Sequence, residues 1–554
     1  MEAMLEFLHI EAICTELELI WIKIQNDTDI IFENLNHFEI LMLIIIGYFV
    51  YLLLMYTINS PTYQRICDFL LCRTLRKVTM APTEEGKQEA EEYWGNKTVC
   101  KVKNVYSELP MEPLQDKEFK RIVDELSKDN DLILGTQNFG KNKYKSSKEM
   151  HSEVEKLSNR ANGIFFKSNP MHYDLFEGNC QMEAEVIKMC ANIYKGDVET
   201  CGVLDCSEAD CIRNALLSYR AWSKDYKGIT IPNVIAPQTF DPSLNRAGEL
   251  LDVEIRRIPV DNNAKMSPKD IAYYVDENTI AIFLSNPDGA FGVFDSIKSI
   301  AEYCYRQGMG CHVDCSHSSF LLGFDGVNFG KEDQGNFETK GVTSIGVSLN
   351  KYGLGSPGTS CLLYKTRILR KSQYYAHYNW NGGMYTSPNL SGSRYGSAIA
   401  ATWVKMLGTG KNIYTKKAND IIDSTLKLRA DLKERSGHLD ILTEETLSVL
   451  AFKLKNGDSY NLADFLRNKG FNVVNTINPQ AISLTVTEVN NEMLPDLKKF
   501  IDEYIKNYLG KNAKYEGEGI QKFYENRDTL LNYIHTKFDL PDLMKNTREE
   551  IRLQ

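Results

Sequence analysis

Several common signatures are missing from this 554-residue sequence. Its 13 cysteines include no CxxC pair and are too sparse for the disulfide framework of a small secreted domain, so they are predicted to be reduced thiols. Positive charge is in deficit: 64 Lys and Arg against 74 Asp and Glu give a net charge of −10, which argues against a nucleic-acid partner. With 43% hydrophobic and 25% charged residues, the composition excludes a disordered, collagen-like or polytopic membrane chain.

Charged residues are absent from residue 40 to residue 64, and residues 40–58 read ILMLIIIGYFVYLLLMYTI. A helix needs about 20 apolar residues to cross a bilayer core, so one transmembrane helix is predicted here. The segment begins too far into the chain, and lacks the basic leader, for a signal peptide. Acidic residues precede it, whereas Arg65, Arg73 and Arg76 follow it, so the positive-inside rule places the bulk of the chain in the cytosol.

Beyond about residue 180, helical stretches alternate with short apolar runs. This rhythm predicts an α/β fold with a mostly parallel sheet covered by helices and with chemistry at the carboxyl ends of the strands. From residue 406 the pattern indicates a smaller α+β domain. Strands are predicted at 233–237, 251–259, 279–285, 311–314 and 342–347, and helices at 182–194, 210–223 and 296–307.

The predicted organisation has five parts. A lumenal N-terminus, with a glycosylation sequon at Asn26, comes first and is followed by the transmembrane helix. A membrane-proximal linker with N-terminal helices, a large domain and a small C-terminal domain with a tail follow in that order. The boundaries are 1–39, 40–58, 59–160, 161–405 and 406–554.

Four potential metal ligands and a carboxylate fall within seven residues: Cys311, His312, Asp314, Cys315 and His317. The run is predicted to be a buried strand that ends in a loop. Alternate side chains of a strand point to opposite faces, so these groups do not converge on one ion, and no metal site is predicted.

Two residues at predicted strand ends suggest covalent catalysis. Lys351 follows the strand at 342–347 and precedes a glycine-rich loop, where a desolvated amine could form a Schiff base. Asp314 ends the strand before it, and a carboxylate at that position could pair with a protonated pyridine nitrogen. The pair points to pyridoxal phosphate chemistry.

The surrounding motifs strengthen this interpretation. In order, and at compatible spacing over about residues 110–510, they resemble the sphingosine-1-phosphate lyase family of group II pyridoxal-phosphate-dependent decarboxylases, in a divergent form. They include NPMHYDLF at 169–176, HVD at 312–314, NKYG at 350–353, WNGGMYTSP at 380–388 and SGSR at 391–394.

The resemblance implies pyridoxal-phosphate fold type I and a homodimer with active sites at the subunit interface. It also implies residence in the endoplasmic reticulum membrane as a single-pass protein with its bulk in the cytosol. The family reaction belongs to sphingolipid catabolism. It is the retro-aldol cleavage of a sphingoid base 1-phosphate into a fatty aldehyde and phosphoethanolamine.

Carried over residue by residue, the resemblance makes Lys351 the Schiff-base lysine and Asp314 the partner of the cofactor ring nitrogen. His172, Gly392 and Ser393 match further candidate contacts to the cofactor. Arg394, His172 and nearby lysines are the groups available to compensate for a changed phosphate pocket.

The phosphate pocket departs from the family pattern. A Gly-Gly-Thr-type turn is replaced by DCSEAD at residues 205–210, which carries three carboxylates. Each would repel the cofactor phosphate, because unit charges about 5 Å apart repel by roughly 3 kcal/mol at an effective dielectric constant of 20. Asp241 replaces a ring-stacking His, Asn350 a His and Pro357 a Lys. The altered positions are therefore Cys206, Ser207, Glu208, Ala209, Asp241, Asn350 and Pro357.

Two functions stay open. In the first, the protein is a working lyase with a rebuilt phosphate pocket that cleaves a phosphorylated sphingoid base; Lys351 and Asp314 favour this. In the second, it is a catalytically inactive, membrane-anchored paralogue that acts as a binding or dimerisation partner, as a homodimer or as a heterodimer with an active relative. The acidic residues Asp205, Glu208 and Asp241 favour the second.

Overall fold

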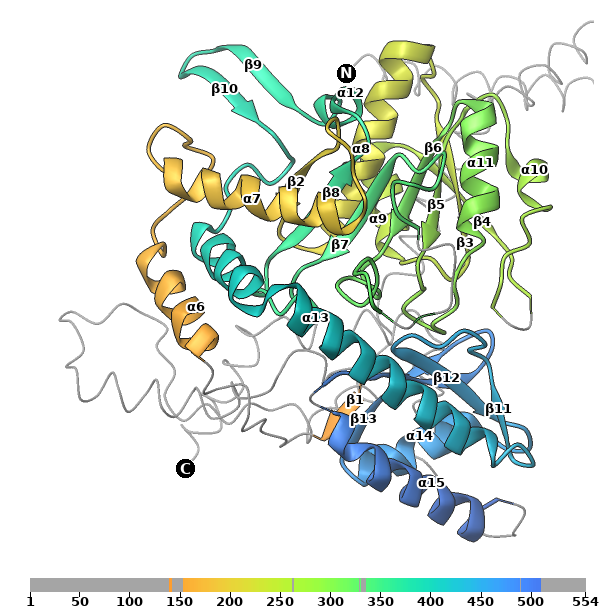
Figure 1. Ribbon diagram of the computed structural model, residues 1–554. Coiled ribbons are helices and arrows are strands. Elements are labelled where there is room, and N and C mark those ends of the chain that lie inside the picture. Colours follow the sequence, from red (N-terminus) through yellow and green to blue (C-terminus); the bar gives the residue numbers. More distant parts are fainter. Residues whose placement is uncertain are drawn as a thin grey trace, which may run out of the picture. The chain divides into compact units, whose positions relative to one another are not determined.

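The computed structural model describes residues 139–141, 153–261, 264–327, 329, 335–488 and 490–509 (Figure 1). The predicted transmembrane segment at 40–58, the Asn26 sequon and residues 59–138 lie outside this range. Within the described residues, no helix is both long enough and apolar enough to cross a membrane.

A seven-stranded sheet forms the larger part, in the order β2-β8-β7-β6-β5-β3-β4. Neighbours from β4 through β7 are parallel, and β8 is antiparallel to both β7 and β2. The mostly parallel α/β sheet predicted from the sequence is confirmed. The strands are β2 (Cys201–Asp205), β3 (Asn233–Pro237), β4 (Glu254–Ile258), β5 (Thr279–Ser285), β6 (Gly310–Asp314), β7 (Ser344–Ser348) and β8 (Ser360–Tyr364).

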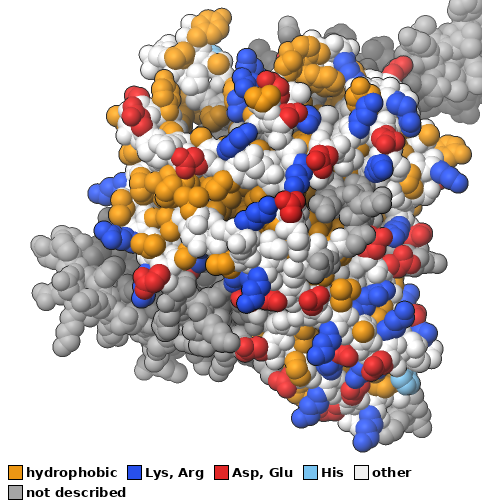
Figure 2. Space-filling view, viewed as in Figure 1, with side chains coloured by type: hydrophobic (Ala, Val, Ile, Leu, Met, Phe, Trp, Pro, Cys, Tyr) orange, Lys and Arg blue, Asp and Glu red, His pale blue; other side chains and the backbone are white. Residues whose placement is uncertain are grey.

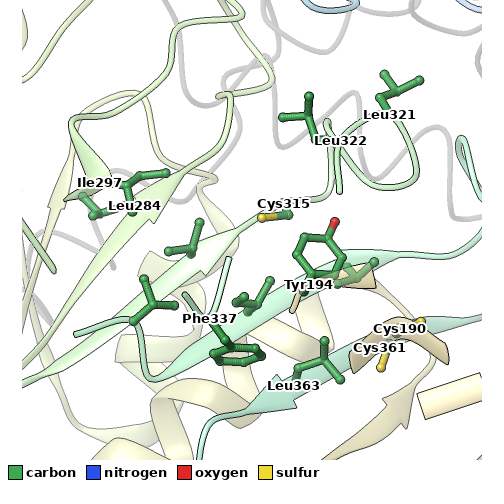
Figure 3. Close-up of a cluster of buried hydrophobic side chains, with 14 of the residues drawn as sticks. Cys190, Tyr194, Leu284, Ile297, Cys315, Leu321, Leu322, Phe337, Cys361 and Leu363 are labelled. Carbon is green, nitrogen blue, oxygen red and sulfur yellow. The ribbon is translucent and has the colours of Figure 1, made fainter. Parts of the chain in front are cut away.

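Helices cover both faces of this sheet, and its central strands β5, β6 and β7 are buried throughout. On one face Leu284 of β5 packs in a buried cluster with Ile297 (Figure 3). On the other, Phe283 meets the rings of Tyr219 and Phe240 edge-on at 5.9 and 5.8 Å. The helices are α7 (Glu177–Ile193), α8 (Glu208–Lys227), α9 (Ser243–Leu251), α10 (Ile271–Tyr274), α11 (Ile297–Gln307) and α12 (Arg367–Lys371).

A second, antiparallel sheet has the order β1-β13-β14-β12-β11 and its own buried core. Two helices and a 3-10 turn accompany it. The elements are β1 (Phe139–Lys141), β11 (Leu439–Ile441), β12 (Val449–Leu454), α14 (Ser459–Asn468), β13 (Phe471–Thr476), β14 (Ala481–Thr485), η1 (Asn491–Met493) and α15 (Leu494–Asn507).

The helix α13 (Gly396–Lys433) connects the two cores (Figure 1). Its first part buries Ile399 in the core of the large sheet, and its last part buries Leu432 in the core of the small one. At Gly410 the backbone leaves helical geometry, with φ 69° and ψ 162°, so the element consists of two helices across a kink. Near its start it packs against α6 (Glu153–Ile164).

A separate hairpin is formed by β9 (Tyr375–Trp380) and β10 (Gly383–Ser387). Residues 372–393 contain no Asp, Glu, Lys or Arg. The side chains of Tyr378 and Trp380 are nevertheless 88% and 57% exposed, and hydrophobic atoms gather at the hairpin in Figure 2. It is an apolar ribbon without cover from the rest of the described chain.

The turn before β7 gives a test of the packing. Gly341 has φ +103°, and a Cβ there would overlap the carbonyl oxygen of Ala301 on α11. Gly341→Ala should therefore lower the free energy of unfolding of the full-length chain by about 2–3 kcal/mol in a denaturant titration. Gly178→Ala is the matched control, because a Cβ in α7 meets open space and alanine favours helix. Equal effects of the two changes would contradict the packing.

Candidate active site

The candidate site lies where three strands of the large sheet end. β6 and β7 are parallel, with Asp314 opposite Gly346. β8 pairs antiparallel with both β7 and β2, so β2 and β7 run in the same direction and their carboxyl ends share one edge. Asp314 ends β6, Lys351 follows β7, and α8 begins at Glu208 just after β2. Residues about 140 positions apart in sequence thus meet at one edge.

Lys351 and Glu208 form an ion pair across this edge. Nζ of Lys351 lies 3.5 Å from Oε1 of Glu208, and both side chains are about two-thirds buried. The hydroxyl of Ser348 donates to the same Oε1 at 2.6 Å and also lies 2.9 Å from Oδ1 of Asn350. Burial raises the pKa of Glu208, but the Lys351 ammonium and the Ser348 hydrogen bond together lower it below its ordinary value. Glu208 is therefore a carboxylate at neutral pH.

Asp314 is a buried carboxyl fixed by the next turn. Its Oδ1 accepts from the backbone N–H of Ser316 at 3.0 Å and from the Ser316 hydroxyl at 2.5 Å. Burial raises the pKa of Asp314 to about 6, the charge of Asp241 also raises it, and the charge of Lys351 lowers it. The sequence-predicted residues Asp314, Lys351 and Asp241 are thus close enough to act on one another.

The other two carboxylates of the 205–210 turn have partners of their own. Oδ1 of Asp205 accepts from the side-chain amides of Asn214 at 2.9 Å and Asn389 at 3.0 Å. Asp210 accepts from the Ser207 hydroxyl and forms an ion pair with Arg213. Of the three acidic groups that the sequence places at this turn, only Glu208 is engaged with Lys351.

The remaining altered positions have local roles. Asp241 accepts from the backbone N–H of Ser243 at 2.8 Å, in the first turn of α9. Cys206 is half-buried, and burial raises the pKa of its thiol. Ala209 and Pro357 are exposed.

The loop of the SGSR motif is tied to the end of β2. The backbone N–H of Gly392 donates to Asn389 Oδ1 at 3.2 Å, and Asn389 in turn binds Asp205. Ser393 Oγ accepts from the Asn169 amide at 3.1 Å. His172 is exposed.

Arg394 binds Glu183 through Nε at 2.9 Å and Nη2 at 2.7 Å, and its side chain is 7% exposed. A buried guanidinium engaged in two parallel bonds is committed to that carboxylate. Arg394 is therefore not available to the Lys351 site.

Three contributors to the site were not assigned a role there from the sequence. Ser316 holds the carboxyl of Asp314, and Ser348 holds the carboxylate of Glu208, which pairs with Lys351. His317 was considered only as a metal ligand. Burial, and to a lesser degree the charge of Lys351, lower the pKa of His317 to about 3, so it is a neutral imidazole near Lys351.

The residues present fit a pyridoxal-type cofactor in part. An amine and a buried carboxyl at neighbouring strand ends suit its aldehyde and its ring nitrogen. The phosphate end does not fit, because a carboxylate stands at the start of α8 where a free helix N-terminus would bind a phosphate.

Comparison with known proteins defines the class. Residues 144–455 match the family model described as a pyridoxal-dependent decarboxylase conserved domain, more than half of the chain. The solved sphingosine-1-phosphate lyase of Burkholderia pseudomallei has a TM-score of 0.68 at 24% identity, covering 73% of this chain and 94% of that one. Glutamate decarboxylase of Lactobacillus brevis has a TM-score of 0.61 at 17% identity, covering 74% and 96%. These two likenesses concern the fold.

Curated relatives narrow the class. Sphingosine-1-phosphate lyase of Drosophila melanogaster is 30% identical over 423 residues, 74% of this chain and 76% of the relative. The Saccharomyces cerevisiae lyase is 26% identical over 409 residues, 73% and 69%. The chain belongs to the sphingosine-1-phosphate lyase family of pyridoxal-phosphate enzymes, as its motifs suggested. Family membership indicates pyridoxal phosphate as the cofactor.

The buried Asp205 generates a pH-dependent prediction. Within the described residues, Oδ2 of Asp205 has no hydrogen-bond partner, and burial raises the pKa of Asp205 from 3.8 to about 6. The folded protein therefore binds this proton more tightly than the unfolded chain, and stability is lost as pH rises from about 4 through 6. Asp205→Asn removes the charge and keeps the Oδ1 acceptor. We expect it to raise the free energy of unfolding by on the order of 2 kcal/mol at pH 8 and much less at pH 4.

Asp197→Asn is the control, because its expected effect on folding stability has the opposite sign. Its hydrogen bond to Lys365 is the main cause that lowers the pKa of Asp197 to about 2, so the stabilisation by Asp197 is present throughout pH 4–8. This variant should have a lower melting temperature at both pH values. A lower melting temperature of Asp205→Asn at pH 8 would contradict the assignment of Asp205 as a destabilising buried charge.

Proposed function

We propose that this chain is a pyridoxal-phosphate-dependent carbon–carbon lyase that cleaves phosphorylated sphingoid bases in sphingolipid catabolism. The observation that supports this most directly is the placement of Lys351 and Asp314 at the ends of two neighbouring parallel strands. The relatives named sphingosine-1-phosphate lyase supply the substrate class.

Each residue has a defined task in this proposal. Lys351 would hold the cofactor through its amine, and Asp314 would bind the ring nitrogen. Bound pyridoxal phosphate supplies a conjugated ring that stabilises the electron pair left by carbon–carbon cleavage. The two bonds from Ser316 fix the Asp314 carboxyl in one orientation, so the carboxyl does not have to reorganise when it meets a cationic partner.

The surroundings proposed for the enzyme follow its sequence. Residues 40–58 would anchor it in the endoplasmic reticulum membrane, with the domains at 161–405 and 406–554 in the cytosol.

We propose a dimer in which a second subunit covers the apolar hairpin around Tyr378 and Trp380, because such a ribbon is costly to leave in water. The subunits are two copies of this chain, or one copy and an active relative.

A second candidate function rests on the closed Lys351–Glu208 pair and on the commitment of Arg394 to Glu183. Both observations favour a catalytically inactive paralogue that acts as a binding or dimerisation partner. Lys351 and Arg394 are each paired with a glutamate, so neither side chain is available to replace the family's phosphate contacts.

Release of phosphoethanolamine separates the two functions. The full-length chain in detergent, with excess pyridoxal phosphate and a phosphorylated C18 sphingoid base, should release phosphoethanolamine and a fatty aldehyde. Lys351→Ala should reduce this release by at least about a thousandfold, because the amine that holds the cofactor is lost. Lys340→Ala, a surface change over the ring of Tyr305, should leave it unchanged. A folded, dimeric wild type without any release would favour the inactive partner.

A further inference from the structure

We propose that the Glu208 carboxylate is an internal substitute for the cofactor phosphate, so that pyridoxal phosphate enters this site only by displacing it. The consequence is a site whose preference for pyridoxal phosphate over the phosphate-free aldehyde is far smaller than that of a helix N-terminus free to bind phosphate. This inference rests on the proposed function in one respect, because it takes the Lys351–Asp314 site as the place of the cofactor.

The first support is the use of the donors at the start of α8. A helix N-terminus binds an anion through backbone N–H groups that have no partner within the helix. Here the N–H of Glu208 is bonded by its own carboxylate, and the N–H of Asp210 donates to the Ser207 hydroxyl at 3.2 Å. Two of the backbone donors at this helix start are therefore already used by side chains of the same turn.

The second support is the other side of the pair. Glu208 is held by Ser348 at the end of β7 and by Lys351 just beyond it. Its side chain therefore links the helix that follows β2 to the end of β7. Nζ of Lys351 lies 3.5 Å from the Glu208 carboxylate. Because both side chains are largely buried, solvent and salt screen this pair less than a surface pair.

The third support is the state of the neighbouring cations. The charge of Arg394 acts on Asp205 and Cys206 at this turn, and the charge of Arg213 acts on Cys206. Arg213 is paired with Asp210, and Arg394 is bound at two points to Glu183. Neither is left to neutralise a phosphate dianion placed beside Glu208.

These contacts predict which ligands the site distinguishes. A dianionic phosphate meets the charge of Glu208 and has to displace it from three hydrogen-bonding or ionic partners. Pyridoxal, which carries the same aldehyde and ring without the phosphate, avoids the repulsion. Wild type should therefore bind pyridoxal phosphate no more than about threefold more tightly than pyridoxal.

The test compares the two aldehydes in the full-length chain and its variants. Each is titrated by absorbance, and covalent attachment at Lys351 is measured by peptide mass after borohydride reduction. Glu208→Gln keeps the size of the side chain and removes its charge. It should tighten pyridoxal phosphate binding at least about tenfold and change pyridoxal binding less than about threefold. Glu208→Gly with Ala209→Thr should increase the preference for the phosphate further.

Asp225→Asn is the control, since it removes an equal charge from an exposed carboxylate near the C-terminal end of the same helix, away from Lys351 and Arg213. It should leave the ratio of the two affinities unchanged. Ser348→Ala is a second route, because it removes the hydrogen bond that holds Glu208 without touching the helix. It should shift the ratio toward the phosphate.

The outcomes separate the inference from the lyase proposal. A strong wild-type preference for pyridoxal phosphate that Glu208→Gln does not alter would overturn the inference, as would an equal shift in Asp225→Asn. A Glu208→Gln protein that gains pyridoxal phosphate at Lys351, yet releases no phosphoethanolamine, would support the inference while the lyase proposal fails.

Discussion

The parallel pairing of β5, β6 and β7 is the constraint on which the rest of the site depends. These strands are buried on both faces. Polar side chains can therefore reach solvent or one another only at the strand ends, along one edge of the sheet. Asp314 and Lys351 are brought together by this edge and not by proximity along the chain. The site is therefore retained as long as the core packs, even when the residues around it change.

The sequence could predict this framework because its signals are local. Apolar runs such as 279–285 and 233–237 correspond to β5 and β3 without any shift, and Lys351 and Asp314 were recognised from their places after such runs. β8 was not predicted: its antiparallel insertion between β2 and β7 requires pairing with β2, which is distant in the sequence. Only that insertion brings the end of β2, and with it Glu208, to the edge that carries Lys351.

The partner of each polar side chain was harder to predict from the sequence than the positions of the strands. Three carboxylates between Asp205 and Asp210 look equivalent in sequence, yet one binds two buried amides, one binds Arg213, and only Glu208 reaches Lys351. Arg394 likewise could be counted as a free cation from its motif, whereas Glu183, 211 residues away in the chain, takes up its guanidinium. The outcomes for Glu208 and Arg394 depend on long-range partners that periodicity and spacing do not encode.

The pattern of retained and altered residues has a physical logic. Changes at Glu208 and Asp241 leave the packing intact, because one carboxylate is neutralised by Lys351 and the other accepts a backbone hydrogen bond at the start of α9. The Glu208 carboxylate that disfavours the phosphate also pairs with the largely buried charge of Lys351 and stabilises it. Where the family resemblance implies a turn that binds an anion, the Glu208 carboxylate thus makes the turn internally satisfied through Lys351 and Ser348.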